Sequence, residues 1–234
     1  MGTDGVNSWA RQKVGILWGV KNYNQMAIVA DISSEKKHES IACQWFNQKE
    51  ILALLPTVEG RFSMVLSLPI AIGQKLMAEK KDVFNDYLNT ITKKRFGNLK
   101  LASDLSFVNL SLSTVDSYVG KRIALVGDSA HTIHPLAGLG LNLGIYDLMS
   151  LFNHCDWFCD DKVNFDPGDK KKLKDYNSDR LKKVLLVQHS LDFLVDFFGS
   201  SGKYVSSFRG FGLNFVDKIP IVKKNLILRA RSTF

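Results

Sequence analysis

Residues 122–147 constrain the fold more than any other part of this 234-residue chain, because they join an apolar strand to an acidic turn, a glycine-rich loop and a helix. The segment reads RIALVGDSAHTIHPLAGLGLNLGIYD. Residues 123–126 are a short apolar run, which predicts a buried strand. Gly127 and Asp128 follow at once, so we expect the Asp128 carboxylate just beyond the C-terminal end of that strand. Open α/β sheets bind their ligands at this edge.

A glycine-rich loop follows the acidic turn and leads into a predicted helix. Pro135 precedes Gly138, Gly140 and Gly144, and apolar residues then recur at helical spacing: Leu141, Ile145, Leu148, Leu151 and Phe152. Glycine lets the backbone approach a ligand closely, and the first turn of a helix presents unpaired N–H groups to an electron-rich group. With Asp128 as an acceptor for hydroxyl groups, these donors predict a site for a polar, partly anionic cofactor. The alternative role for Asp128 is to cap a turn or helix.

These residues resemble the second flavin-binding motif of the FAD-dependent aromatic hydroxylases, in particular the branch that hydroxylates the ring of ubiquinone precursors. The resemblance implies that Gly127 and Asp128 lie at the ribityl chain of FAD. It also implies that a further set of residues surrounds the flavin: Pro135, Gly138, Gly140, Leu141 and Asn142. This chain has Leu139 where the family usually has Gln, which alters the polarity expected near the ring.

Two further segments carry the same resemblance. Residues 2–8, GTDGVNS, followed by Arg11, resemble the family's Asp-Gly motif. That likeness implies that Asp4 and Gly5 contact the cofactor and that Arg11 offers its permanently charged planar group to phosphate. A more diffuse likeness covers the C-terminal part: Tyr176, Arg180, residues 213–220 and residues 223–231.

Complete members of this family open with a strand, a G-x-G-x-x-G turn and a helix that hold the ADP half of FAD. Only Met1 precedes the Asp-Gly motif here, and the glycine cluster of residues 138–144 has one residue too many for that fingerprint. We therefore expect an α/β fold that forms the C-terminal part of an FAD/NAD(P)-binding Rossmann-like fold. It would have an antiparallel-sheet substrate domain and a helical C-terminal section.

The expected domain boundaries follow the order of the motifs. We expect a remnant of the FAD-binding domain in residues 1–20, the substrate domain in 21–118, the second flavin motif in 119–160 and the helical section in 161–234. Alternating and apolar runs predict strands at residues 23–32, 40–46, 51–55, 62–68 and 107–118, with helices at 70–96 and 170–198.

Composition limits the compartment and the partners. No apolar run reaches the roughly 18 residues that a membrane-spanning helix needs, and three cysteines without framework spacing favour a reducing, cytoplasmic setting. Residues 203–234 carry seven basic residues and one acid. This segment predicts a solvated helix docked on its own domain, or alternatively a peripheral contact with anionic lipids of the inner membrane. No nucleic-acid motif is present, so nucleic acid is not an expected partner.

Other kinds of site fit the sequence less well. Asp128, His131 and His134 could ligate a metal, but Pro135 and the glycines indicate a loop, and we assign no metal site. Ser129 lacks the G-x-S-x-G elbow of a hydrolase. We expect Cys155 and Cys159 to be buried thiols, and His189 to be a structural histidine within an apolar helix.

The resemblance implies an FAD-dependent monooxygenase that hydroxylates the aromatic ring of a polyprenyl phenol in ubiquinone biosynthesis, with NAD(P)H as the electron donor. No side chain is assigned as catalytic; His134 is placed near flavin or substrate only because it adjoins Pro135. The competing prediction is a catalytically inactive fragment or non-catalytic subunit of a quinone-biosynthesis complex. A third is a chain that complements a separately encoded N-terminal half, whose absence would leave apolar surface exposed.

Overall fold

The structure is a computed structural model, which describes residues 1–47, 50–135, 138–156 and 166–199, and side chains as far as Phe193. Its elements, in chain order, are α1 (Trp9–Lys13), β1 (Trp18–Ser34), β2 (Cys43–Asn47), β3 (Glu50–Pro56), β4 (Phe62–Pro69), α2 (Ile70–Ala78), α3 (Lys81–Thr92), β5 (Leu99–Leu101), β6 (Ser106–Val115), β7 (Val119–Gly120), β8 (Ile123–Ala124), the 3-10 turn η1 (Gly127–Ser129), β9 (His131–Thr132), α4 (Gly140–His154) and α5 (Lys170–Gly199). The mixed α/β class with an antiparallel sheet is as predicted. Within the described part, no helix is both long enough and apolar enough to span a bilayer.

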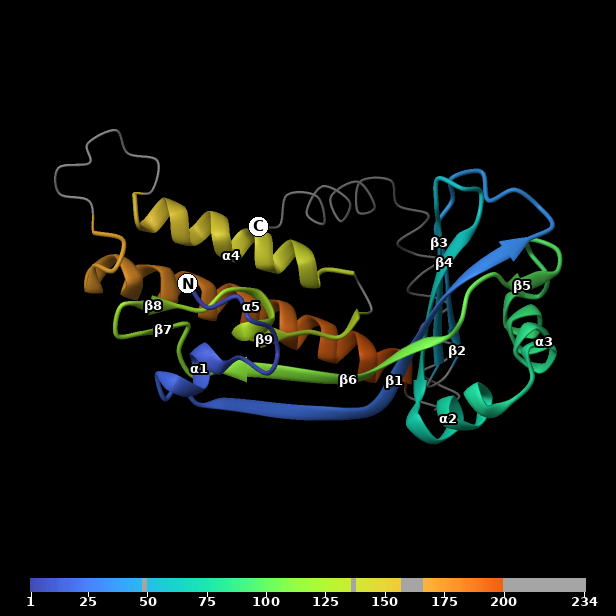
Figure 1. Cartoon of the computed structure of the whole chain (residues 1–234), viewed down its shortest axis with the longest axis horizontal. Helices are drawn as coiled ribbons and strands as arrows, with labels where there is room; N and C mark the ends of the chain where they lie inside the picture. Colours follow the sequence, from blue (N-terminus) through green and yellow to red (C-terminus); the bar gives the residue numbers. More distant parts are fainter. Residues whose placement is uncertain (48–49, 136–137, 157–165, 200–234) are drawn as a thin grey trace.

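One antiparallel sheet organises the molecule. Its strand order is β2-β3-β4-β1-β6-β9, and β5 pairs with the far end of β1. The 17-residue β1 is much longer than the predicted strand 23–32, because its first part continues past the substrate sheet to pair with β6 as far as Val115. In Figure 1, β1 runs from the strands at the right to α1 at the left.

A bulge interrupts β1 in its middle. The pairing with β6 shifts between Asn22 and Gln25, and Asn24 adopts a left-handed conformation with φ of 53°. Such a bulge bends the strand and re-aims the side chains beside it. Tyr23 and Gln25 flank Asn24, and both contact groups outside the sheet.

Two separate hydrophobic clusters form the core. The first lies between α2, α3 and strands β1, β3, β4 and β5, and its fully buried members include Phe62, Leu66 and Leu88. The second lies beneath α4 and α5 and includes Leu125, Leu143 and Tyr176. The first cluster lies within the predicted substrate domain, whereas the second combines residues of all four predicted domains, whose boundaries stay a prediction.

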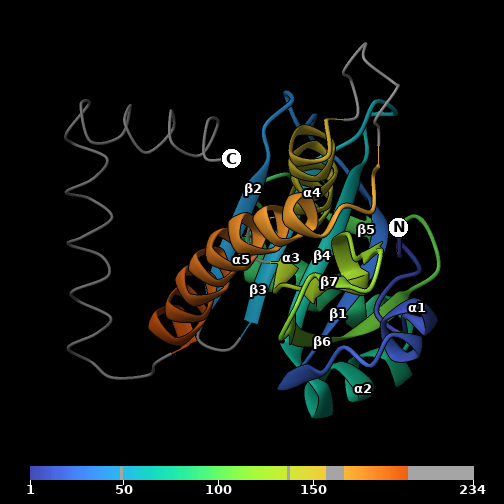
Figure 2. The ribbon, with the colours of Figure 1, turned by 90° about the vertical axis from the view of Figure 1, so that its left-hand side faces the viewer.

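Helices α4 and α5 lie side by side over the strands that lead into the acidic turn (Figure 1). In the turned view, α1 and α5 lie on opposite sides of β6 and β7 (Figure 2). The short segment from β8 to β9 is thus enclosed between helices of both ends of the chain.

Several expectations about local structure are corrected. The single helix predicted over residues 70–96 is two helices, because Glu79 and Lys80 adopt extended backbone between them. The predicted apolar face of α4 is wrong in the first half of the helix, where Leu141 is 77% exposed and Ile145 45% exposed, whereas Leu143 and Asp147 face the core. Leu151 is buried as predicted, and Leu148 packs against the same cluster.

Two expectations concern single side chains on the helices. His189 is exposed rather than structural, and its neighbour Gln188 is buried instead. Cys155 is buried as expected. The predictions for Cys159 and for residues 203–234, including the likeness at 213–220 and 223–231, lie outside the described residues.

Leu66→Ala tests the first core cluster. Leu66 is fully buried at the centre of β4, so its truncation should lower the free energy of unfolding by about 2–5 kcal/mol. Leu55→Ala on neighbouring β3 is the matched control, because Leu55 is 44% exposed. Urea unfolding followed by tryptophan fluorescence measures both; equal effects would contradict the core assignment.

Candidate cofactor site

The two acidic motifs meet at the ends of two adjacent parallel segments. Gly2 pairs in parallel with Leu125: the Gly2 N–H donates to Ala124 O at 2.8 Å, and the Val126 N–H donates to Gly2 O at 3.0 Å. Asp4 follows Gly2 by two residues and Asp128 follows Leu125 by three, so both carboxylates lie beyond the C-terminal ends of neighbouring segments. This is the edge at which α/β folds bind ligands.

Arg11 joins the first motif to the second. Its side chain is only 1% exposed and stacks on Trp18 at 3.9 Å. Nη1 donates to Ser129 O and Nη2 to Val6 O, both at 2.7 Å. In this structure Arg11 therefore binds backbone oxygens of both motifs; its predicted contact with a phosphate stays a prediction.

The remaining residues of the first motif form a turn before α1. Asp4 accepts hydrogen bonds from the Ser8 hydroxyl at 2.6 Å and the Ala10 N–H at 3.0 Å, which lower the pKa of its carboxyl. Asp4 thus supports the N-terminus of α1, whose N-cap residue is Ser8. Gly5 has φ of 79°, and no atom lies within 4 Å of where its Cβ would be. The backbone of Gly5 is accordingly open to a ligand.

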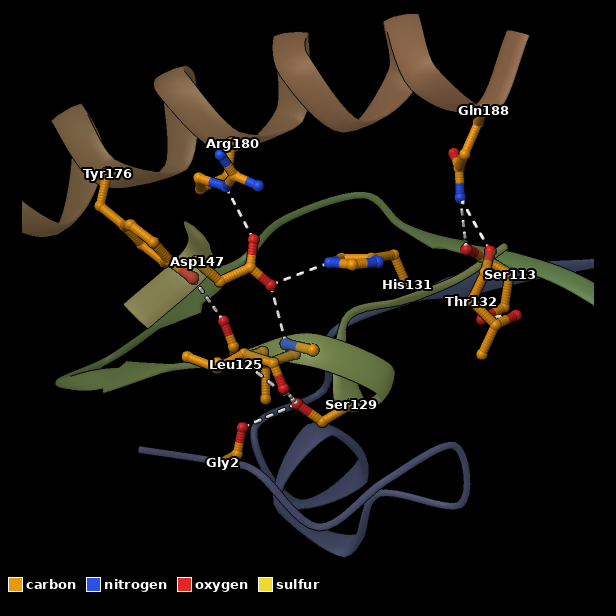
Figure 3. Close-up of polar contacts among 12 residues, drawn as sticks. Gly2, Ser113, Leu125, Ser129, His131, Thr132, Asp147, Tyr176, Arg180 and Gln188 are labelled. Carbon is orange, nitrogen blue, oxygen red and sulfur yellow. Dashed lines mark hydrogen bonds and ion pairs between the residues drawn. The ribbon is translucent and has the colours of Figure 1, made fainter. Parts of the chain in front are cut away.

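The turn at Gly127 is held by a buried carboxylate on α4. Asp147 is fully buried, and its Oδ2 accepts from the Gly127 N–H and contacts His131 Nε2, both at 2.8 Å. Its Oδ1 accepts from Arg180 Nε of α5 at 2.7 Å (Figure 3). One carboxylate therefore links α4, α5, β9 and the acidic turn, and leaves Asp128 itself exposed.

Other contacts of α5 hold the same segment. The Tyr176 hydroxyl donates to Leu125 O at 2.7 Å, and burial raises its pKa. Gln188 Nε2 donates to Ser113 O at 2.9 Å and to Thr132 O at 3.2 Å (Figure 3). The strand-and-turn segment is thus fixed along its length, as a site for a large ligand requires.

The loop before α4 and the first turn of this helix present backbone N–H donors and open space beside two glycines. Leu139 caps α4 without a side-chain hydrogen bond, and the first three N–H groups of the helix have no intrahelical acceptor: Gly140, Leu141 and Asn142. Gly138 has φ of 62°, and no atom of the described residues lies within 4 Å of where a Cβ would be at Gly138 or Gly140. These features suit an electron-rich, polar group such as that of FAD.

A second polar cluster lies beside Pro135, where the loop meets the β1 bulge. His134 is fully buried and its Nε2 lies 3.1 Å from Gln25 Oε1, while its ring packs edge-on against Tyr23. The Tyr23 hydroxyl donates to Asp192 of α5, which also pairs with Lys21 at 2.9 Å. Burial lowers the pKa of His134 to about 4, although Asp192 opposes the shift. The imidazole is therefore neutral at physiological pH.

The alternative metal site is not assembled. His131 contacts Asp147 and His134 contacts Gln25, whereas Asp128 is exposed. Among the described residues, no three His, Cys, Asp or Glu side chains are placed to hold a metal ion. Ser129 is also unlike a nucleophile, because its hydroxyl donates to Gly2 O at 2.7 Å in a buried backbone contact.

Sequence reasoning missed the residues that hold the site together. Asp147 was passed over as part of an apolar helix, although an acid four residues from both Leu143 and Leu151 is an available signal of a buried, paired carboxylate. Arg180 and Tyr176 were singled out only by a diffuse likeness. The sequence does not distinguish the buried Gln188 from its exposed neighbour His189, because both side chains are polar.

Asp147→Ala should lower the free energy of unfolding by about 3–5 kcal/mol, because it leaves the buried Arg180 guanidinium without its carboxylate. Asp128→Ala is the control, and its exposed side chain predicts a change within about 0.5 kcal/mol. Chemical denaturation measures both variants. A loss for Asp147→Ala no larger than the control would show that the network does not stabilise the fold.

His134 predicts a pH dependence of stability. Its folded pKa of about 4 lies below the ordinary value of 6.5, so the unfolded chain binds more protons between these values. Stability is therefore complete above pH 6.5 and falls by up to about 3 kcal/mol as the pH drops to 4. His134→Gln should flatten this part of a denaturation-versus-pH curve. His154→Gln, which keeps His134, should retain the wild-type slope; parallel curves for all three proteins would refute the assignment.

Comparison with known proteins agrees with this geometry. The family described as FAD binding domain matches residues 1–185. Ubiquinone hydroxylase UbiL of Rhodospirillum rubrum is 29% identical over 233 residues, which cover 100% of this chain and 54% of that protein. The mitochondrial ubiquinone biosynthesis monooxygenase COQ6 of Homo sapiens is 26% identical over 261 residues, which cover 97% of this chain and 55% of that protein. The chain thus spans about half the length of these relatives.

Solved structures share the fold. The p-nitrophenol 4-monooxygenase PnpA of Pseudomonas putida superposes with a TM-score of 0.75 at 16% identity, over 97% of this chain and 56% of that one. PqsL of Pseudomonas aeruginosa, solved with 2-aminobenzoylacetate, gives a TM-score of 0.70 at 19% identity, over 89% of this chain and 57% of that one. With both acidic motifs at one edge and a family match over most of its length, the chain belongs to the FAD binding domain family.

Proposed function

We propose that this chain forms part of an FAD-dependent monooxygenase that hydroxylates the aromatic ring of a polyprenylated phenol in ubiquinone biosynthesis. The observation that carries the proposal is the convergence of Asp4, Asp128 and the open first turn of α4 at one edge. The names of the relatives UbiL and COQ6 supply the substrate class.

Each predicted residue has a role in holding the cofactor. Asp128, exposed beyond the turn that Asp147 fixes, accepts from hydroxyl groups of the ribityl chain. The N–H groups at the start of α4 and the bare backbone of Gly138 face the electron-rich flavin. Asp4 and Gly5 meet the cofactor nearer its phosphates. Arg11 keeps this motif in register with Ser129.

When bound, FAD supplies the redox and oxygen chemistry, and the protein supplies orientation and polarity. The substrate sheet borders the flavin loop at the cluster of His134, Gln25 and Tyr23. Because Gln25 Oε1 accepts there, the imidazole proton lies on Nε2, and the neutral ring adds no charge beside an uncharged phenol. We assign no catalytic base.

The electron donor, assembly and location extend the same proposal. NAD(P)H would reduce the flavin, as the likeness of the Asp-Gly motif implies. The polyprenyl tail of the substrate favours peripheral contact with the inner membrane. A quinone-biosynthesis complex would supply that substrate.

A second candidate is a non-catalytic or complementing subunit. Helix α4 exposes Leu141, Ile145 and Met149 at 77%, 45% and 53%, four residues apart along one face. An apolar row of this kind favours burial against another polypeptide. A separately encoded half that holds the ADP part of FAD would complete the site in that way.

Flavin binding by the purified chain tests the proposal and separates the candidates. The visible spectrum and equilibrium dialysis with FAD should show a bound flavin. Asp128→Ala should weaken binding about 10- to 100-fold, because a charged acceptor is lost. Asp116→Ala, an exposed acid on another loop, is the control.

The outcomes differ clearly. Unchanged binding in Asp128→Ala would refute the ribityl role of Asp128. A wild-type chain that ignores FAD would refute autonomous cofactor binding and favour the subunit. Turnover of polyprenyl phenols would then be assayed only with a complementing half present.

A further inference from the structure

A cavity of about 540 Å³ lies between the β7–β8 hairpin and the first turns of α5. Val119 and Leu173 form its apolar wall, and Lys121, Arg122, Lys170 and Lys174 line its polar side. None of the predicted cofactor-binding residues lines it. In Figure 1 the β7–β8 hairpin and the start of α5, which line the cavity, lie at the left end of the molecule, whereas α4 begins nearer its middle. Its volume is within the range of small-molecule sites.

The cavity gathers positive charge from two separate elements. Lys121 and Arg122 lie in the hairpin turn, and Lys170 and Lys174 lie one turn apart at the start of α5. All four side chains are exposed. Among the described residues, no carboxylate forms an ion pair with any of the three lysines. The positive charge of these three lysines is therefore available to an anion.

Arg122 is held in place at the rim. Its Nη1 and Nη2 donate to the two carboxylate oxygens of Asp166 at 3.0 and 2.7 Å. A Cβ at Gly168 would lie 2.7 Å from Arg122 Cζ, so the guanidinium occupies the space that any other residue would fill. This pairing fixes the orientation of the planar guanidinium group.

Two local features run against folding stability. The first turn of α5 carries Lys170, Lys171 and Lys172 where the helix dipole is positive, and only the Asp169 carboxylate, which accepts from the Lys172 N–H at 2.9 Å, and the ion pair of Lys172 with Asp156 oppose this charge among the described residues. Arg122 adopts a left-handed conformation with φ of 59°, which is unfavourable for a residue with a side chain. Such conflicts concentrate where function requires them. A bound anion would offset part of the repulsion among these cations.

We propose that this cavity binds the phosphate group of an ester whose apolar chain lies against Val119 and Leu173. The three lysines supply ammonium donors to the oxygens of a phosphate, beside the Arg122 guanidinium that Asp166 holds at the rim. A hydrocarbon chain that covers the apolar wall removes apolar surface from water and so favours binding, which inorganic phosphate cannot do. A phospholipid and a free alkyl phosphate share this chemistry. The site is independent of the flavin site, so either can fail alone.

Calorimetry of the full chain with monomeric n-octyl phosphate, inorganic phosphate and 1-octanol tests the site. Octyl phosphate should bind about tenfold more tightly than either of the others, and its affinity should fall with added salt. The double variant Lys121→Ala/Lys174→Ala should weaken it about tenfold. The exposed pair Lys75→Ala/Lys80→Ala removes equal charge elsewhere and should leave binding within about twofold.

Gly168→Ala supplies a test without a change of charge. Its methyl group displaces the Arg122 guanidinium, whose flexible side chain can move without unfolding the protein, and octyl phosphate binding should weaken about threefold. No octyl phosphate binding, equal loss in the control lysine pair, or 1-octanol binding as tightly as octyl phosphate would overturn the proposal.

Vesicles distinguish the two sources of the ester. Flotation is measured with phosphatidylcholine vesicles, with and without phosphatidic acid. Loss of phosphatidic-acid-dependent flotation in Lys121→Ala/Lys174→Ala assigns the site to a lipid headgroup. Unchanged flotation, with octyl phosphate binding still lost in that variant, assigns it to a free phosphate ester.

Discussion

The carboxylate of Asp147 lies where two helices, a short strand and the acidic turn meet, and the geometry of the cofactor edge depends on it. Its two oxygens serve three nitrogens from separate parts of the chain. A buried carboxylate without such partners would be prohibitively unstable, so each partner constrains the others. The exposed Asp128 owes its position to this arrangement, because its neighbour Gly127 is the residue that Asp147 binds.

The same principle links the N-terminal segment to the rest. Arg11 is buried although it is charged, and the backbone oxygens of Val6 and Ser129 compensate it. The hydrogen bond from Arg11 to the Ser129 carbonyl, 118 residues away in sequence, is a long-range contact and not a local turn feature. The two motifs therefore act as one unit, although each alone resembles an ordinary capped turn.

Strands and helix types could be predicted because local periodicity decides them. The alternation in residues 62–68 and the apolar spacing in 170–198 both gave elements close to those observed. Which residues of α4 face the core could not be predicted as well. Leu141 and Leu143 belong to two different rows of the same spacing, and the choice between them depends on Asp147, whose burial requires Arg180 more than thirty residues away. The length of β1 likewise depended on pairing with β6, a tertiary contact absent from local patterns.

The long strand β1 has a mechanical consequence. It contributes Ile28 and Ile32 to one hydrophobic cluster, and its first residues pair with β6 beside the other cluster. The two halves thus share one continuous backbone instead of a flexible linker. Any rotation of the larger part of the sheet toward the acidic turn must bend that strand, and the bulge at Asn24 is the place where its pairing is already interrupted. Tyr23 and Gln25 on either side of Asn24 contact α5 and the flavin loop, so such a bend would reach both at once. A bend of β1 would therefore concentrate at Asn24, while the paired segments on either side of it stay straight.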